Sequence, residues 1–320
     1  MMDRASQTDH TGHSTRRRFM AASAALVAAP ALIGTPRSAS AKAELQGSAR
    51  PRFARFKLGT CEVTILHIGG SVVENIQSTF GVGAPAEEFR ALAEANFLPA
   101  DKSFSTLAPV VVNTGSEVIL FDTGISASGL IPALDAAGLK ADQIDLVVLT
   151  HLHPDHIGGL RSGDAPTFPN AKIMLGRVEY DYWAPLGNEQ VKANVTPLID
   201  KATFLKGNDA VAWGIIAVES FGHTPGHLAF LLESGGQKLM ITGDAANHHV
   251  FSLARPDWVV RFDVDKAKAA QTRRSLFGRL ADERIPFSGY HMPGAALGYV
   301  AREGDGFRYT PATYQFSLNG

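Results

Sequence analysis

The sequence predicts a layered α/β domain, and two observations support this prediction. Short apolar stretches at 118–121, 146–149 and 239–242 each run directly into polar residues, as buried strands do. The stretches 86–96 and 265–280 have the composition and spacing of helices. Strands that alternate with helices are typical of sheets covered by helices, so we expect the chemically important side chains just past the strand ends.

The composition is that of a globular protein with a substantial core. Of 320 residues, 45% are hydrophobic and 19% are charged, and the formal net charge is −1. A charge so close to zero favours neither a nucleic-acid partner nor an anionic membrane surface. Cys61 is the single cysteine, which excludes an intramolecular disulfide and a cluster of thiolate ligands. Its apolar surroundings indicate a buried structural thiol.

The N-terminal residues have the three-part pattern of an export signal. A basic segment at 14–20 contains three consecutive arginines before Phe19, an alanine-rich uncharged segment follows at 21–33, and the small residues 39–41 come next. The arginines followed by phenylalanine are similar to those of a twin-arginine signal. A short membrane anchor is the alternative, but the apolar run is too short and too rich in alanine to span a bilayer well.

This pattern divides the chain into three parts. We expect residues 1–41 to be a signal peptide of the twin-arginine type, 42–52 a linker and 53–320 the folded domain. The mature protein would then be periplasmic or secreted, with no stable insertion in a membrane after cleavage of the signal.

Four side chains of the kinds that bind metals fall close together, directly after an apolar stretch: His151, His153, Asp155 and His156. Positions two apart in an extended chain point the same way, so His151 and His153 can hold one ion. Pro154 turns the chain and presents the next two side chains to a different point. Imidazole and carboxylate suit zinc and its first-row neighbours.

Three further positions favour a metal site over the alternative of a polar loop that merely contains histidines. His223 lies in the run Gly-His-Thr-Pro-Gly-His at 222–227, Asp244 follows the apolar stretch 239–242, and His291 follows Gly-Tyr at 289–290. A histidine-rich loop alone would leave the other histidines scattered. Run and context together predict a metal centre.

These motifs resemble those of the metallo-β-lactamase superfamily: an HxHxDH run, then GHTxGH, then Gly-Asp after a strand, then a late histidine. The resemblance extends over most of the chain, from about residue 53 onward. It implies a four-layer αβ/βα sandwich with two mixed β-sheets and the metals at one edge.

The resemblance also implies how the ligands are shared between two divalent ions, with zinc as the expected metal. The first ion would take His151, His153 and His223, the second would take Asp155, His156 and His291, and Asp244 would bridge both. A hydroxide between the ions would be the nucleophile, so no serine or cysteine nucleophile is required. Asp155 and Asp244 are the candidates for moving a proton to the leaving group.

Several neighbouring residues are expected near the centre. Asp122 matches a position that supports a ligand histidine, although a turn aspartate is the alternative. His227 is expected to be a hydrogen-bonded structural histidine. Trp183 would form part of an aromatic substrate pocket, against the alternative of a core or surface tryptophan. His249 and Phe251 are the other expected pocket residues.

Within the superfamily, the sequence resembles the branch of methyl parathion hydrolase and the acyl-homoserine lactonases. The resemblance rests on the segments 112–115, 121–124 and 168–171 and on Tyr182-Trp183. It implies hydrolysis of an ester, lactone or phosphotriester in a small molecule, and dimers are common in this branch. The stretch after Asp122 lacks the phenylalanine that would help wall an organophosphate pocket, so the bond cleaved stays open.

Other functions on the same scaffold are the alternatives. An iron-dependent oxygenase would use one metal instead of two, and metal content with an oxygen-consumption assay would separate it from a hydrolase. A non-catalytic periplasmic metal-binding protein is a further alternative, but simple binding would not need the second ligand set of Asp155, His156 and His291. A true β-lactamase usually lacks the bridging aspartate that Asp244 supplies, and the glutathione-binding region of a glyoxalase-type thioesterase is not evident. The segment 80–105, which is rich in glycine and proline turns, is either a cap over the site or a surface excursion.

Overall fold

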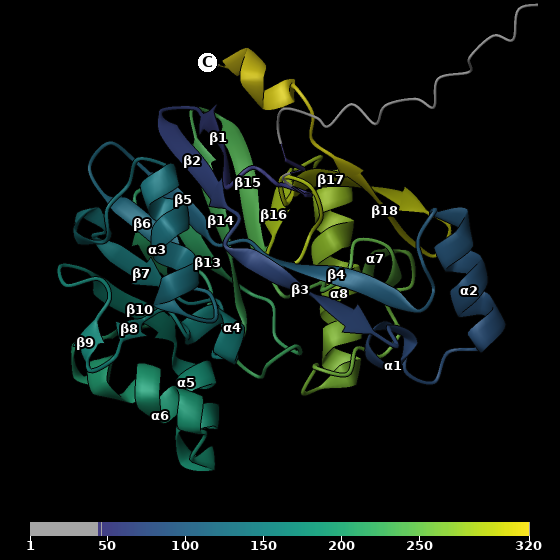
Figure 1. The fold of residues 1–320 in the computed structure, drawn as a ribbon, viewed down its shortest axis with the longest axis horizontal. Helices are drawn as coiled ribbons and strands as arrows, with labels where there is room; N and C mark the ends of the chain where they lie inside the picture. Colours follow the sequence, from purple (N-terminus) through teal and green to yellow (C-terminus); the bar gives the residue numbers. More distant parts are fainter. Residues whose placement is uncertain (1–43, 46, 320) are drawn as a thin grey trace, which may run out of the picture. The chain divides into compact units, whose positions relative to one another are not determined.

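Two seven-stranded sheets form the centre of the fold (Figure 1). The computed structural model describes residues 44–45 and 47–319, and the fold lies in the unit that begins at Ala49. The predicted signal peptide, 1–41, therefore lies outside the described residues, as does part of the predicted linker. Among the described residues, no helix combines the length and the apolar character needed to cross a membrane.

The first sheet is mixed, with antiparallel pairing among its first strands and parallel pairing from β6 to β11. In spatial order its strands are β1 (Phe53–Leu58), β2 (Cys61–Leu66), β5 (Val110–Asn113), β6 (Val118–Phe121), β7 (Leu146–Val148), β10 (Lys172–Gly176) and β11 (Thr203–Leu205).

The second sheet is also mixed, since β15 and β16 run parallel within an otherwise antiparallel sheet. In spatial order its strands are β12 (Ala210–Ala212), β13 (Ile215–Glu219), β14 (Leu228–Ser234), β15 (Gln237–Gly243), β16 (Phe287–Gly289), β17 (Leu297–Glu303) and β18 (Gly306–Pro311).

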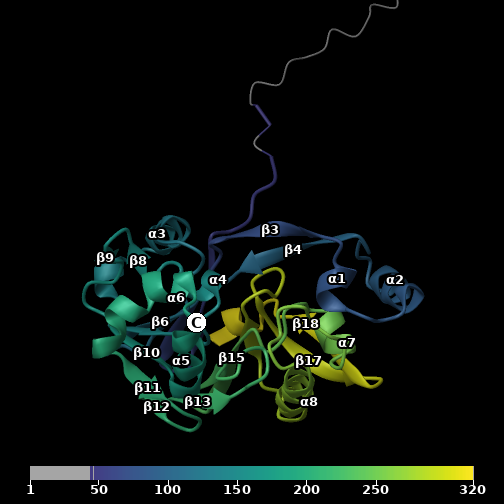
Figure 2. The ribbon, with the colours of Figure 1, turned by 90° about the horizontal axis from the view of Figure 1, so that it is seen from below.

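Helices cover the outer faces of both sheets, as Figure 2 shows. On the side of the first sheet lie α3 (Ala127–Ala136), α5 (Arg177–Trp183) and α6 (Glu189–Asn194), and the second sheet carries α8 (Lys266–Asp282). The shorter helical elements are α4 (Pro154–Ile157), α7 (Phe251–Ala254), η1 (Ala141–Gln143), η2 (Ala184–Leu186), η3 (Thr196–Lys201) and η4 (Gln315–Asn319).

The alternation of side chains along β6 separates two cores. Ile119 and Phe121 pack in the cluster that also contains Phe230 of the second sheet. Leu120, between them, packs in another cluster with Leu130 of α3. Successive strand residues point to opposite faces, so one sheet faces both its partner sheet and its own helices. The predicted four-layer sandwich with two mixed sheets is confirmed.

An arm of chain between β2 and β5 carries a two-stranded ribbon of β3 (Gly69–Glu74) and β4 (Lys102–Leu107), with α1 (Gln77–Phe80) and α2 (Ala86–Ala95) between its strands (Figure 1). A second small ribbon pairs β8 (Arg161–Ser162) with β9 (Ala165–Pro166).

The predicted segment 80–105 belongs largely to the arm between β2 and β5. Phe89 of α2 is fully buried and stacks on Phe251, with 4.2 Å between ring centroids. Trp258 stacks with the same two rings, with centroid distances of 5.7 Å to Phe89 and 6.5 Å to Phe251. The segment is thus packed against the main fold by an aromatic core of its own.

Candidate metal centre

The ends of parallel neighbouring strands bring the predicted ligands together. The strands β6 and β7 run parallel, so Asp122 and Thr150, which follow them, lie side by side. In the second sheet β15 and β16 run parallel, so Asp244 and His291 emerge at the same edge. The loop after β7 then leads through His153 into α4, whose first turn presents two more ligand-type side chains.

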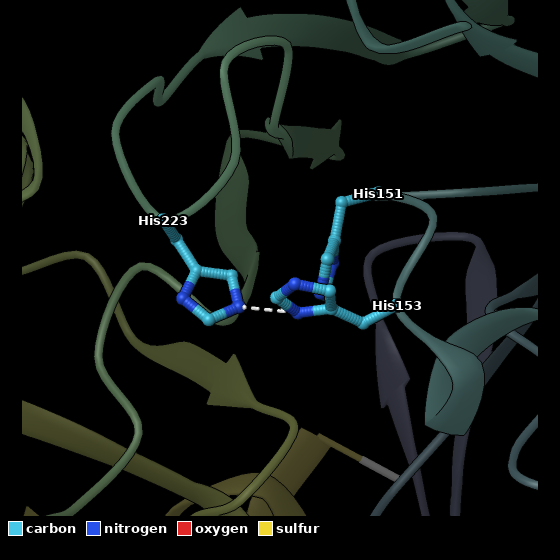
Figure 3. A group of neighbouring side chains, drawn as sticks. All are labelled: His151, His153 and His223. Atoms are coloured by element: carbon cyan, nitrogen blue, oxygen red, sulfur yellow. Dashed lines mark hydrogen bonds between the residues drawn. The ribbon is translucent and has the colours of Figure 1, made fainter. Parts of the chain in front are cut away.

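Figure 3 shows the first ligand cluster, in which His151, His153 and His223 point toward one another. One nitrogen from each ring lies within 4.8 Å of the others. His223 Nε2 lies 3.0 Å from His153 Nδ1. Three imidazoles that converge on one point form the donor set of a zinc site.

The second cluster consists of Asp155, His156 and His291, whose ligand atoms also lie within 4.8 Å of one another. Asp155 Oδ2 lies 3.5 Å from His291 Nε2 and 3.8 Å from His156 Nε2. This cluster therefore mixes one carboxylate with two imidazoles. Its donors suit the same divalent metals as those of the first cluster.

Asp244 lies between the two clusters and reaches both. Its Oδ2 is 3.4 Å from His223 Nε2 of the first cluster and 3.2 Å from His291 Nε2 of the second. Its Oδ1 is 3.4 Å from His156 Nε2. A carboxylate in this position can serve two ions at once and can offset the repulsion between two dications.

Three buried polar atoms at the centre have no hydrogen-bond partner: His151 Nε2, His156 Nε2 and Asp244 Oδ1. Leaving one such atom unsatisfied costs about 1–3 kcal/mol. Three unsatisfied atoms that face one point, all of them good metal donors, are explained by a bound divalent cation. The residues therefore fit the metal that their types predict.

The other nitrogen of each second-cluster histidine is held by the protein. Asp122 Oδ2 lies 2.8 Å from Nδ1 of His156 and also accepts a hydrogen bond from the hydroxyl of Thr150. The main-chain carbonyl of Thr106, in β4, lies 2.6 Å from Nδ1 of His291. Such contacts fix the ring orientation and leave Nε2 as the nitrogen that could bind a metal. Asp122 itself adopts a positive φ of 61°, a strained conformation of the kind that clusters at functional sites.

A buried ion pair supports the first cluster. Asp263 Oδ1 lies 2.9 Å from Nδ1 of His223, and its Oδ2 accepts a hydrogen bond of 2.8 Å from the guanidinium of Arg273. Arg273 is 1% exposed and also donates to the carbonyls of Pro256 and Trp258. Sequence reasoning missed this pair, because neither residue belongs to a local motif.

Glu179 of α5 joins the two loops that carry the first cluster. One oxygen accepts from the amide of Leu152, which lies between two ligand histidines, and the other accepts from the amide of Gly226. Trp183 donates its indole N–H to the same carboxylate. Burial raises the pKa of Glu179, and these hydrogen bonds oppose that rise. This residue was also missed, since its charge on a helix resembles that of a surface residue.

Close packing explains both glycines of the run at 222–227. A Cβ on Gly226 would lie 2.1 Å from the amide nitrogen of Glu179. A Cβ on Gly222, which has a φ of 128°, would lie 2.2 Å from the amide nitrogen of Ala269. Only glycine permits these approaches. Within the same run, His227 accepts a hydrogen bond from the amide of Asp244 and so positions that carboxylate, as expected of a structural histidine.

Burial favours the neutral form of two first-cluster histidines, His151 and His153. It lowers the pKa of His151 well below its ordinary value, and it lowers that of His153 to about 3. Burial opposes ionisation of Asp244, but the neighbouring charges of His291 and His156 outweigh it and hold that pKa well below its usual range. His151 and His153 are therefore neutral and Asp244 is ionised, which are the forms that bind metals. At His156 and His291 burial opposes the charged form, but the neighbouring carboxylates outweigh it and raise the pKa, so these two rings release a proton when a metal binds.

A cavity of about 520 Å³ opens onto the two clusters. His153, Asp155, His223, Asp244 and His291 all line it. Its mouth is apolar, since Ile125 is 62% exposed and Phe262 is 46% exposed. Phe80 and Ser105 also line this cavity, so the ends of the segment 80–105 form part of its wall.

The predicted pocket residues lie in three different places. Trp183 packs edge-on against His153, with 5.6 Å between ring centroids. His249 lines two neighbouring cavities and not the cavity that is lined by the candidate metal ligands. The prediction for Phe251 is wrong: its side chain is fully buried and stacks on Phe89, because the helix α7 turns it away from the cavity and into the core.

Comparisons with known proteins agree with this geometry. Residues 108–288 match the Metallo-beta-lactamase superfamily. The chain is 33% identical over 157 residues to the uncharacterized protein YobT of Bacillus subtilis, and 32% identical over 161 residues to the N-acyl homoserine lactonase AttM of Agrobacterium fabrum. These matches cover 44% and 46% of this chain. They span 64% and 59% of the relatives, which is less than two thirds of either.

Solved structures match over a larger share of the chain. The dizinc quorum-quenching lactonase AidC, in complex with a product, is 27% identical with a TM-score of 0.74, and the match covers 82% of this chain and 98% of that one. The hydrolase AbOPH shares the fold at 22% identity, with a TM-score of 0.77 over 84% of this chain and 100% of the other. Sequence match, fold and ligand geometry agree: the chain belongs to the metallo-beta-lactamase superfamily.

Proposed function

We propose that this protein is a metal-dependent hydrolase that holds two divalent ions, with zinc as the expected metal, and opens lactone rings of the acyl-homoserine type. One observation carries the proposal: two separate three-residue ligand clusters lie at the same cavity, and the carboxylate of Asp244 reaches both. The similarity to the dizinc lactonase AidC and to the lactonase AttM supports the choice of metal and substrate.

Each ion would have its own ligands and would share Asp244. His151, His153 and His223 would hold the first ion, and Asp155, His156 and His291 would hold the second. Ions bound there would supply a Lewis acid for the carbonyl oxygen and a hydroxide formed from water near neutral pH. The buried carboxylates Asp122 and Asp263 would keep the histidine rings aimed at the centre.

Asp155 is the residue best placed to move the proton. Its side chain is 29% exposed and lines the cavity, whereas that of Asp244 is 4% exposed and lies between the clusters. Opening a lactone breaks the ring C–O bond and leaves an alkoxide that needs a proton. Asp155 would accept the proton that the attacking water loses and deliver it to that oxygen.

The apolar mouth of the cavity supports a substrate with an acyl chain. Ile125 and Phe262 present exposed apolar surface beside the ligand clusters, and Val73 and Leu107 extend this surface along the ribbon. Burying an acyl chain there contributes roughly 0.8 kcal/mol per methylene group. We therefore expect the ratio kcat/KM to rise as the acyl chain of the lactone lengthens.

A panel assay with metal analysis on the same sample tests the proposal. The zinc-loaded protein should hydrolyse N-hexanoyl-homoserine lactone faster than an aryl phosphotriester, a β-lactam or a thioester. The exposed variant Asp164→Ala serves as the control and should retain full activity. Turnover of the phosphotriester alone would contradict the lactone assignment and indicate a phosphotriesterase. Oxygen consumption together with one bound iron would contradict the hydrolase assignment and indicate an oxygenase.

We also propose that the protein acts outside the cytoplasm. The basic, apolar and small-residue order of the segment 14–41 supports this, together with the three consecutive arginines. A reporter fused to residues 1–52 should be exported, and replacing Arg16 and Arg17 by lysine should retain it in the cytoplasm. Export of the arginine variant at the normal rate would contradict the twin-arginine route.

A homodimer remains a prediction from the resemblance to the lactonase branch. Size-exclusion chromatography with light scattering on the folded domain checks it. A mass near that of one domain would contradict it.

A further inference from the structure

A second cavity, of about 800 Å³, lies on the other face of the β3–β4 ribbon from the metal centre. Ser71, Val73 and Ser105 line the metal cavity. Val72 and Phe104 line the second cavity. Val72 pairs with Phe104 in the ribbon, and neighbouring strand residues point to opposite faces, so the ribbon separates the two spaces.

The walls of the second cavity are mainly apolar. Phe53, Ile76 and Leu98 contribute to them, and the loop 293–295, which follows the ligand His291, closes one side. Two apolar side chains stand open to solvent there: Val72 is 57% exposed and Phe104 is 43% exposed. Cavities of about 300–1,000 Å³ with apolar walls and a few polar groups are typical of small-molecule sites.

The charges at this cavity are all of one sign. Arg50 and Lys102 line it, and no aspartate or glutamate appears among its described lining residues. The guanidinium of Arg50 lies 4.3 Å from the centre of the Phe104 ring. Neither cation forms an ion pair with a carboxylate of the described chain. Glu74 is the strand partner of Lys102, but it does not line the cavity and no ion pair joins the two.

The imidazoles of the cavity add hydrogen-bonding capacity without charge. Burial, with a contribution from the charge of Arg50, lowers the pKa of His67. Burial lowers the pKa of His249 to about 4 and that of His248 well below its ordinary value. At neutral pH the permanent charges of the cavity are therefore those of Arg50 and Lys102.

We propose that this second cavity is a binding site for an amphipathic carboxylate, an unbranched acyl chain that ends in one negative charge. The chain would lie along Val72, Phe104 and Ile76, and the carboxylate would meet Arg50 and Lys102. Arginine binds carboxylates through two parallel hydrogen bonds, and its place over Phe104 holds it beside the apolar wall. The site uses none of the metal ligands, so it stands independently of the proposed reaction.

Two neighbouring valines allow a matched test, because they lie on opposite faces of the same strand. Isothermal titration calorimetry of the zinc-loaded protein with dodecanoate should give a stoichiometry of about one bound dodecanoate per chain. The substitution Val72→Trp fills the second cavity and should weaken binding at least tenfold. The same substitution next to it, Val73→Trp, points into the metal cavity and should leave dodecanoate binding unchanged.

The opposite pattern would overturn the proposal, because binding lost in Val73→Trp and kept in Val72→Trp would place the carboxylate at the metal centre. Absence of binding to the wild-type protein would overturn it as well. Thermal unfolding of both variants checks that each is folded, since Val72 is exposed but Val73 is half-buried.

A second pair of variants tests the charge. Replacing both Arg50 and Lys102 by alanine should lower the affinity for dodecanoate at least tenfold and change the affinity for dodecanol less than twofold. Lys57→Ala, an exposed lysine of β1 away from the cavity, is the matched control and should change neither. Equal losses for dodecanoate and dodecanol would contradict a carboxylate site.

Discussion

The two ligand clusters differ in how the protein supports them. The first contains only histidines. Two buried carboxylates support it: Asp263, which is paired with Arg273, and Glu179, which accepts hydrogen bonds from both loops that carry the cluster. The second contains a carboxylate and rests on Asp122 and on a main-chain carbonyl of the ribbon. The first cluster is thus fixed by the core of the fold, and the second depends partly on the arm between β2 and β5.

This difference predicts that the two proposed ions respond to different substitutions. Loss of a buried support of the first cluster should cost folding stability as well as metal. Loss of a support of the second cluster should cost metal affinity with little change in folding. Variants of each kind therefore separate the clusters experimentally.

The largest effect is expected for Asp244→Ala, because this carboxylate reaches both clusters. Turnover of the lactone should fall to background, and metal content should drop from two ions per chain to one or none. Inductively coupled plasma mass spectrometry on the assayed sample measures the metal. An active variant with two ions would remove Asp244 from the centre.

The next largest effect is expected for Asp263→Asn. The change leaves the buried guanidinium of Arg273 without its countercharge, which costs about 3–5 kcal/mol of unfolding free energy. His223 also loses the partner of its Nδ1, so the first ion should bind more weakly. Denaturant unfolding measures the stability. The exposed pair Asp282–Arg302 provides the control, since Asp282→Asn should cost less than about 1 kcal/mol.

A smaller and more selective effect is expected for Asp122→Asn. The carboxylate that holds Nδ1 of His156 is replaced by an amide, so affinity for the second ion should fall about 10–100-fold. Anomalous diffraction from zinc-loaded crystals identifies which ion is lost. Loss of the first ion instead of the second would reverse the comparison between the clusters.

The smallest effect is expected for Tyr290→Phe. The hydroxyl of Tyr290 donates a hydrogen bond of 2.6 Å to the carbonyl of Asp155, and its ring lies 3.9 Å from that of His156. Removing the hydroxyl keeps the ring and should change the free energy of second-ion binding by about 0.5–1.5 kcal/mol. Competition with a chelator of known affinity measures the change, and a value near zero would exclude the hydroxyl from support of the second cluster.

The sequence allowed prediction of the fold and of the seven candidate ligands for clear physical reasons. Apolar strands that run into polar residues mark the edge where parallel strands end, and histidines two apart after a strand converge on one point. Asp122 was expected from the resemblance to the superfamily, and the parallel pairing of β6 with β7 gives the physical reason for its place beside the ligand run.

The supports and the pocket walls could not be predicted so well. Glu179, Asp263 and Arg273 act through contacts with segments far away in the sequence, and nothing local distinguishes them from surface charges. Phe251 lies close to Asp244 in sequence, but sequence proximity does not fix the direction of a side chain, and the helix α7 turns it into the core. The second cavity could not be predicted, because no local motif indicated that β3 pairs with β4 to form the ribbon that walls it.

The number of zinc ions bound per folded chain distinguishes a two-ion centre from a one-ion centre. Native mass spectrometry of the protein after zinc loading and dialysis should give two ions per chain, one for each cluster. A stable value of one, with the second cluster empty in a crystal structure of the same sample, would contradict the two-ion centre.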